Sequence, residues 1–221
     1  MPDRVVRRSA DRYRTVGEGT ETLHSFSYGR HYDPDNVAFG PVVAINEERL
    51  APGAGYDDHR HEDADIVTWV LDGVLAHEDS TGQRGEVAPG LAQRLSAGSG
   101  VTHAERNASA TEPLRFVQMM LRSRNWDAPD YAQVTVPDGP GLHETVPVHA
   151  DARLLVARPA GEPIEVAAPA GALVHVTRGP VTVDGITLAG GDELRVHGPV
   201  TLRLAGENVE TLVWLPDHPR G

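Results

Sequence analysis

Short runs of β-forming residues alternate with turn residues along most of the chain. In the first half, apolar runs at 42–45, 66–71 and 114–121 are rich in valine, isoleucine and aromatic residues and have the length of buried strands. Turn signals such as Asp72-Gly73 and Pro89-Gly90 separate them at intervals of about ten residues. This rhythm predicts a β-sandwich or barrel.

The same rhythm returns in the second half, after a proline-rich stretch from Ser123 to His149 that we expect to be an irregular connection. The hairpins at 70–75 and 176–181 share a strand–glycine–strand design, which suggests an internal duplication. We therefore predict an all-β chain of two domains, residues 1–130 and 131–221. The strands expected in the second domain lie at 172–176, 181–183, 193–196, 200–204 and 211–215.

Length, charge and composition narrow the class of protein. The 221 residues suit two domains of about a hundred residues each. A net charge of −12 opposes direct binding to nucleic acid. The absence of cysteine leaves imidazole and oxygen ligands for any metal. No segment resembles a signal peptide or a membrane span, so we expect a cytoplasmic protein without a membrane partner.

Two pairs of potential metal ligands have strand spacing. His59 and His61 lie two residues apart, as do His103 and Glu105, so on extended backbone each pair points to one face. If the strands are neighbours, three nitrogens and one carboxylate oxygen converge on a site suited to Fe, Mn, Ni, Cu or Zn. The alternative is that 57–63 is a solvated charged loop.

Longer motifs around these pairs resemble a known family. The segments at 53–73 and 89–107 reproduce the two cupin motifs in order, and those at 59–73, 75–82 and 96–105 are similar to the signature of the pirin family. The resemblance implies two tandem cupin domains, each a jelly-roll β-barrel or sandwich. It also implies one metal in the first domain, on His59, His61, His103 and Glu105. His175 and His197 stand alone, so we expect the second domain to be metal-free.

Several further residues are candidates near this site. Asp65 stands where other cupins carry a glutamate ligand and is the rival to Glu105, which we favour for its longer side chain and its spacing from His103. We expect Asp65, Phe116 and Gln118 in a substrate pocket. His77 lies outside the motifs, and we leave it out of the metal set.

The resemblance extends to bacterial pirin-like quercetin 2,3-dioxygenases, which implies cleavage of a flavonol with O2 on one divalent ion, with Glu105 as the catalytic base. Iron is the expected metal, and nickel, copper, manganese, zinc and cobalt are alternatives. We expect a monomer that takes a small aromatic substrate. The alternative function is a non-enzymatic metal- or redox-sensing module that acts through a protein partner.

Overall fold

The structure is a computed structural model, and it describes residues 3–217. Apart from a short 3-10 helix at Ser9–Asp11, the regular structure of these residues consists of β-strands. The chain divides into two compact units. The N-terminal unit comprises residues 13–135 and 148–150, and the C-terminal unit comprises the described residues of 1–12, 136–147 and 151–221.

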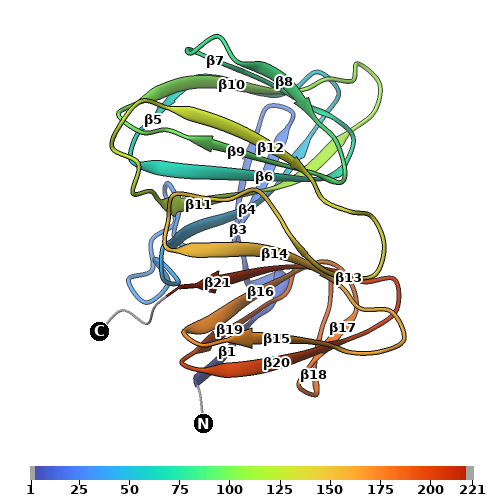
Figure 1. The fold of residues 1–221 in the computed structure, drawn as a ribbon. Helices are drawn as coiled ribbons and strands as arrows, with labels where there is room; N and C mark the ends of the chain where they lie inside the picture. Colours follow the sequence, from blue (N-terminus) through green and yellow to red (C-terminus); the bar gives the residue numbers. More distant parts are fainter. Residues whose placement is uncertain (1–2, 218–221) are drawn as a thin grey trace. The chain divides into compact units, whose positions relative to one another are not determined.

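The N-terminal unit is a sandwich of two antiparallel sheets (Figure 1). Its large sheet has the strand order β12 (Asp130–Thr135), β9 (Leu91–Ser96), β6 (Ala64–Asp72), β11 (Leu114–Arg122), β4 (Val42–Leu50), β3 (Thr20–His24), β2 (Tyr13–Gly17). Its small sheet has the order β5 (Gly55–His61), β10 (Val101–Asn107), β7 (Leu75–Asp79), β8 (Arg84–Val87).

The C-terminal unit repeats this design. Its large sheet has the order β1 (Asp3–Arg7), β19 (Glu193–His197), β16 (Gly171–Arg178), β21 (Glu210–Pro216), β14 (Ala152–Arg158), β13 (Gly141–Glu144). Its small sheet has the order β15 (Ile164–Ala168), β20 (Val200–Ala205), β17 (Val181–Val183), β18 (Ile186–Leu188). The first strand of the chain thus joins a sheet built from its second half.

The interior of the N-terminal unit is apolar at two places and polar between them. Ile66 of β6 belongs to one apolar cluster and Val70 of the same strand to another. Thr68 lies between them on the same face, because strand side chains alternate. Its register partners continue a polar row across six strands of the large sheet: Gln133, Gln93, Thr68, Gln118, Asn46 and His24.

The interior of the C-terminal unit is filled differently. One continuous cluster of valine, leucine and alanine side chains occupies it, with Val174 and Val176 of β16 and Leu202 and Leu204 of β20 among its members. Burial of this apolar surface drives the folding of the unit. The duplicated architecture therefore encloses a polar layer in one unit and an apolar core in the other.

The segment from Ser123 to His149 differs from the expectation of an irregular connection. It contains the edge strands β12 and β13. The prolines bracket these strands instead of interrupting them: Pro129 precedes β12, Pro137 follows it and Pro140 precedes β13. An edge strand tolerates such flanking prolines because one side of its backbone needs no partner.

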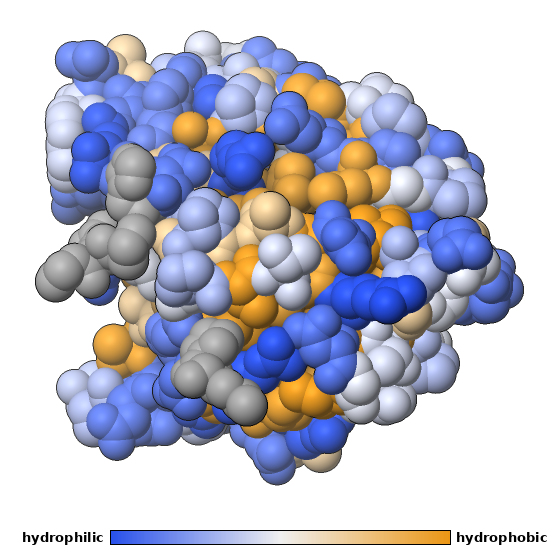
Figure 2. All heavy atoms as spheres, turned by 60° about the horizontal axis from the view of Figure 1, so that its bottom comes forward, coloured by the Kyte–Doolittle hydropathy of each residue, from blue (hydrophilic) through white to orange (hydrophobic). Residues whose placement is uncertain are grey.

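Charged and polar side chains surround apolar areas on the face of the molecule drawn in Figure 2. Large apolar side chains that are exposed among the described residues include Tyr32 and Trp126, at 79% and 66% of their full exposure. Single exposed apolar residues of this kind are common on protein surfaces. No helix among residues 3–217 is long and apolar enough to cross a membrane.

Candidate metal centre

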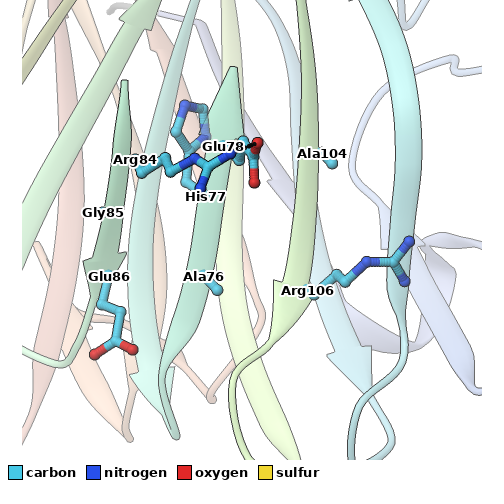
Figure 3. Close-up of a pocket in the computed structure, with 8 residues that line it drawn as sticks. All are labelled: Ala76, His77, Glu78, Arg84, Gly85, Glu86, Ala104 and Arg106. Atoms are coloured by element: carbon cyan, nitrogen blue, oxygen red, sulfur yellow. Dashed lines mark hydrogen bonds and ion pairs between the residues drawn. The ribbon is translucent and has the colours of Figure 1, made fainter. Parts of the chain in front are cut away.

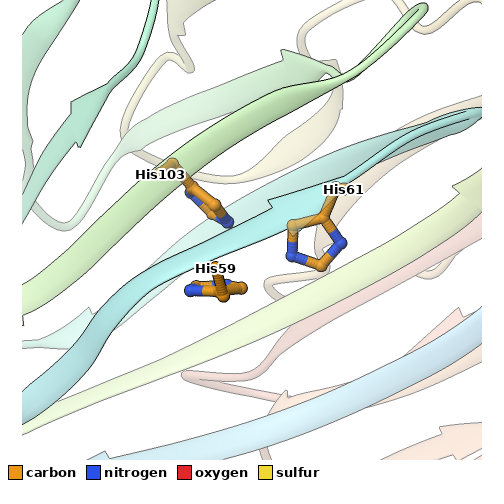
Figure 4. A group of neighbouring side chains, drawn as sticks. All are labelled: His59, His61 and His103. Atoms are coloured by element: carbon orange, nitrogen blue, oxygen red, sulfur yellow. The ribbon is translucent and has the colours of Figure 1, made fainter.

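Three histidines converge where β5 and β10 pair. His59 is the register partner of His103, and His61 is the partner of Val101. The ring centroids of His59 and His103 are 4.3 Å apart. The ring centroid of His61 lies 4.9 Å from that of His59 and 5.0 Å from that of His103. Figure 4 shows the three side chains pointing toward one another. One ring nitrogen from each lies within 4.8 Å of the others.

The site is closed at one end and open at the other. The side chains of His103 and Glu105 on the central strand β10 are buried, at 1% exposure each. His59 and His61 lie on the edge strand β5 and are half-buried. The group is therefore most exposed at β5 and most buried at β10.

The ring nitrogens are arranged to act as electron-pair donors. His59 Nδ1 lies 2.8 Å from the carbonyl oxygen of Asp57. Because a carbonyl oxygen only accepts hydrogen bonds, Nδ1 carries the proton, and Nε2 keeps a free electron pair for a metal. His61 Nε2 and both ring nitrogens of His103 are buried without a hydrogen-bond partner among the described residues. Unpartnered imidazole nitrogens that face one another fit a metal ion such as iron, nickel or zinc.

The electrostatics of the site keep the rings of His61 and His103 neutral, as metal ligation requires. Burial, assisted by the neighbouring His59, lowers the pKa of His61 to about 4. Burial lowers the pKa of His103 to about 3, with further contributions from His59, His61 and His77. Neutral imidazoles have a free electron pair at neutral pH.

Glu105 adds a carboxylate on the same strand. Its Oε2 accepts a hydrogen bond of 2.7 Å from Gln118 Nε2, whereas its Oε1 is buried without a partner among the described residues. Burial, with a smaller contribution from the charge of Glu48, raises its pKa to about 7 against the opposing effect of the Gln118 hydrogen bond. A β-bulge between His103 and Glu105 shifts the pairing, so the partner of Glu105 on β5 is Tyr56.

As a result, Glu105 falls into a second group of ligand atoms. Its carboxylate oxygen lies within 4.8 Å of ligand atoms of His103 and His77, and not of all three histidines of the first group. His77 is the register partner of Glu105 on β7. The sequence signal for this residue was present, because His77 and Asp79 have the same two-residue spacing as the other pairs.

A second buried carboxyl group, which the sequence motifs did not indicate, lies nearby on β4. Glu48 Oε2 accepts hydrogen bonds of 2.6 Å from both Thr22 Oγ1 and Tyr56 Oη. Burial raises its pKa to about 6 despite these hydrogen bonds. Tyr28 is close enough that the charges of Glu48 and Glu105 add to the effect of burial in raising its pKa. These acids and phenols surround the floor of the site.

The other residues expected in a substrate pocket have different surroundings. The Asp65 carboxylate accepts hydrogen bonds from Ser123 Oγ and from the backbone amides of His149 and Ala150, and it lies in neither group of ligand atoms. Phe116 packs in the apolar cluster with Val70 and other residues. Gln118 faces the site through its bond to Glu105.

A hollow of about 430 Å³ lies on the small sheet, with a floor of small residues that includes Ala76, Gly85 and Ala104 (Figure 3). Its borders are charged: Glu78 pairs with Arg84, and Arg106 pairs with Asp57. Ala104 lies between His103 and Glu105 on β10, so its side chain points to the opposite face. The hollow therefore lies on the opposite face of the sheet from the side chains of His103 and Glu105, although His77 also lines it.

In the C-terminal unit, His175 Nδ1 lies 3.1 Å from Glu193 Oε1. The other carboxylate oxygen of Glu193, Oε2, accepts a hydrogen bond from Arg195 Nη2. His197 is exposed. Neither belongs to a group of three potential ligands among residues 3–217. The absence of a metal from this unit stays a prediction.

A chain of two jelly-roll units, one with a histidine-rich group in its interior, is a bicupin. The family model for pirin matches residues 6–121. The chain is 39% identical to a protein of Mycobacterium bovis named "Putative quercetin 2,3-dioxygenase". The match covers 95% of this chain and 93% of that protein. The chain belongs to the pirin family.

Two further comparisons agree. The "Quercetin 2,3-dioxygenase" of Escherichia coli is 29% identical over 86% of this chain and 88% of its own. The crystal structure of the E. coli bacterial pirin YhhW in complex with nickel(II) superposes with a TM-score of 0.90 at 26% identity, covering 99% of this chain and 100% of that chain. The predicted all-β fold of two tandem cupin domains is confirmed. Together with the two ligand groups, the comparisons support a metal ion in this protein.

Proposed function

We propose that this protein is a metal-dependent dioxygenase that opens the central ring of flavonols of the quercetin type. The observation that carries the proposal is the convergence of His59, His61 and His103, with electron-pair donors that find no hydrogen-bond partner among the described residues. The names of the relatives supply the substrate class. The half-buried edge at β5 supplies the access that a flat aromatic molecule needs.

We infer that the ion is held by His59, His61 and His103, with Glu105 as the fourth ligand. A divalent ion bound there would supply Lewis acidity toward the flavonol oxygens and a path for electrons to O2. Iron is the metal we propose, and the same donors also accept nickel, copper, manganese, zinc or cobalt.

The protein groups contribute proton transfer and orientation. Glu105 Oε1 has no hydrogen-bond partner among the described residues, and when substrate occupies the site it can take the proton of the flavonol 3-hydroxyl in place of ligating the ion, while Gln118 holds the other oxygen. A pKa of about 7 suits a base that works near neutral pH. The apolar clusters on either side of the polar row exclude bulk water. Overall, one flavonol and one O2 give one depside and one carbon monoxide.

The experiment is incubation of quercetin with protein loaded separately with each candidate metal, in air and without oxygen. We expect loss of the flavonol absorbance with release of carbon monoxide only in air and only with metal-loaded protein. Free metal at the same concentration controls for autoxidation. Loss of quercetin at equal rates with metal-free protein, or none with any metal, would contradict the proposal.

The role of Glu105 is tested separately. Glu105→Gln is expected to lower kcat by a factor of at least about 100, as loss of a general base usually does. Glu86→Gln, which changes an exposed glutamate on β8, is the matched control and is expected to leave kcat unchanged. Elemental analysis of His61→Ala protein purified without added metal tests the ligand set, because weaker binding is expected to leave this variant with much less metal than the wild type retains.

We also propose a monomeric, cytoplasmic protein, as the sequence predicts. Size-exclusion chromatography with light scattering tests the first point. Action through a protein partner remains the alternative prediction, and a partner that binds in a His59- and His103-dependent manner without turnover would favour it.

A further inference from the structure

A second set of ligand atoms lies deeper in the same unit, on the side of β10 away from β5. On β7, His77 is the register partner of Glu105 and Asp79 is the partner of His103. The ring centroids of His77 and His103 are 5.4 Å apart, and one ligand atom each from His77, His103 and Glu105 lie within 4.8 Å of one another. All three residues are buried, at 3%, 1% and 1% exposure of the whole residue.

His77 is oriented by a carboxylate that is itself fixed. Its Nε2 lies 3.1 Å from Asp79 Oδ2, and both side chains have no exposed surface. Asp79 Oδ1 accepts hydrogen bonds from the hydroxyl and backbone amide of Thr81 and from the amide of Gln83. The Asp79 carboxylate thus accepts a hydrogen bond from Nε2–H of His77, which leaves the electron pair of the ring on Nδ1. Carboxylates orient the histidines of metal sites in this way.

No hydrogen bond within the described part of the chain satisfies the atoms that face one another here. His77 Nδ1, both ring nitrogens of His103 and Glu105 Oε1 are buried without a hydrogen-bond partner among the described residues. Buried polar atoms of this kind destabilise a fold unless something satisfies them. A cation satisfies an imidazole electron pair and a carboxylate oxygen at the same time, and two histidines with one carboxylate are a set that binds iron(II) and similar ions.

We infer that His77, His103 and Glu105 form a second, inner binding position for a divalent transition-metal ion, distinct from the proposed outer position at His59, His61, His103 and Glu105. The inference rests on the proposed metal function and adds to it. Because the two positions share His103 and Glu105, they are alternatives for one ion. Removal of the outer ligands is therefore expected to move the ion inward and not to abolish binding.

The experiment is a titration with Co²⁺, followed by its visible absorption and by calorimetry. Wild-type protein is expected to bind one Co²⁺. The double variant His59→Ala/His61→Ala is expected to bind one Co²⁺ about 10- to 100-fold more weakly, with an altered spectrum. Adding His77→Ala is expected to abolish this residual binding. His197→Ala in place of His77→Ala is the control, since it removes an exposed histidine of the other unit.

A second variant separates ligation from mere packing. Asp79→Asn in the double-variant background is expected to weaken the residual Co²⁺ affinity about 10-fold, in the range usual for a residue that orients a histidine ligand. His77→Gln tests whether a side chain of similar size without an imidazole suffices. Far-ultraviolet circular dichroism and the thermal midpoint identify any variant that has failed to fold, and binding is compared only among folded variants.

The outcomes distinguish the two proposals. If wild-type protein binds one Co²⁺ and the folded double variant binds none, the inner position is wrong and the outer metal centre stands. Residual binding that survives both His77→Ala and His77→Gln also overturns the inner position. If wild-type protein binds no Co²⁺ or other candidate metal, the proposed metal-dependent function itself fails.

Discussion

Glu105 is a carboxyl group that the fold buries between an amide and a set of imidazoles. Its pKa is raised from the ordinary 4.5 to about 7, mainly by burial. The folded, metal-free protein therefore holds a proton that the unfolded chain has released. This proton contributes stability that is fully present below pH 4.5 and is lost as the pH rises through about 7.

The first prediction follows for metal-free Glu105→Gln protein. The wild type loses stability as the Glu105 carboxyl group ionises, whereas the amide of the variant stays neutral. As the pH rises from 5 to 8, the variant is therefore expected to gain stability relative to the wild type, by on the order of 1–3 kcal/mol. Urea unfolding at the two pH values measures it. Glu86→Gln is the control and is expected to show no such gain. If the free energies of unfolding of the variant and the wild type differ by the same amount at pH 5 and at pH 8, Glu105 is already ionised at pH 5 in the folded protein.

Two buried threonines give a matched prediction about hydroxyl groups. Thr68 Oγ1, in the polar row, is buried without a partner among the described residues, whereas Thr177 Oγ1 donates to Glu210 Oε1 at 2.8 Å. Thr68→Val is expected to be neutral or stabilising by about 1 kcal/mol, and Thr177→Val destabilising by about 1–3 kcal/mol. Urea unfolding measures both. Equal losses would show that Thr68 has a partner, such as an ordered water.

At the scale of elements, the two-residue spacing of the ligand pairs indicates which side chains share a face, and the structure brings the rings of His59, His61 and His103 together. The spacing carries no information on the bulge after His103, which moves Glu105 opposite Tyr56. It also does not say which strand lies on the other side of β10. The role of His77 depends on that topology, so sequence motifs alone did not include it.

The bulge depends on a glycine, and this gives a third prediction. A Cβ on Gly55 would lie 2.2 Å from the carbonyl oxygen of Glu105 and 2.6 Å from Cα of Arg106, both of which are backbone atoms. Gly55→Ala is expected to force β5 away from β10, weaken metal binding at least about 10-fold, and destabilise the fold by about 1–3 kcal/mol. Gly190→Ala is the control, because a Cβ there would meet no atom closer than the carbonyl oxygen of Thr177 at 4.0 Å. Calorimetric titration with Co²⁺ and thermal unfolding measure the effects.

At the scale of the whole molecule, the strand patterns predict two β-domains, whereas the assignment of the N-terminal residues needed the structure. β1 pairs with β19 from Asp3 opposite His197 to Arg7 opposite Glu193. Next to it, Arg8 Nη1 and the backbone amide of Ser9 donate to the Asp192 carboxylate. A short, arginine-rich strand has no periodicity strong enough to reveal a partner about 190 residues away.

The fourth prediction concerns this strand. Deletion of residues 1–8 leaves an edge of β19 unpaired and removes Arg8 from Asp192. Amide hydrogen exchange is expected to accelerate in β19 and to stay unchanged in β5 and β10. Mass spectrometry of peptic fragments measures the rates. Faster exchange in β5 to the same degree as in β19 would contradict the assignment of β1 to the C-terminal unit alone.

The course of the chain has a practical consequence. The backbone changes unit after residues 12, 135, 147 and 150. A protease that hydrolyses any one of these junctions therefore leaves two fragments that cannot each be a complete sandwich. Gene fragments cut at the midpoint would likewise lack strands or anchoring amides, so half-proteins are poor reagents here, and point variants of the intact polypeptide are the better means of studying either sandwich.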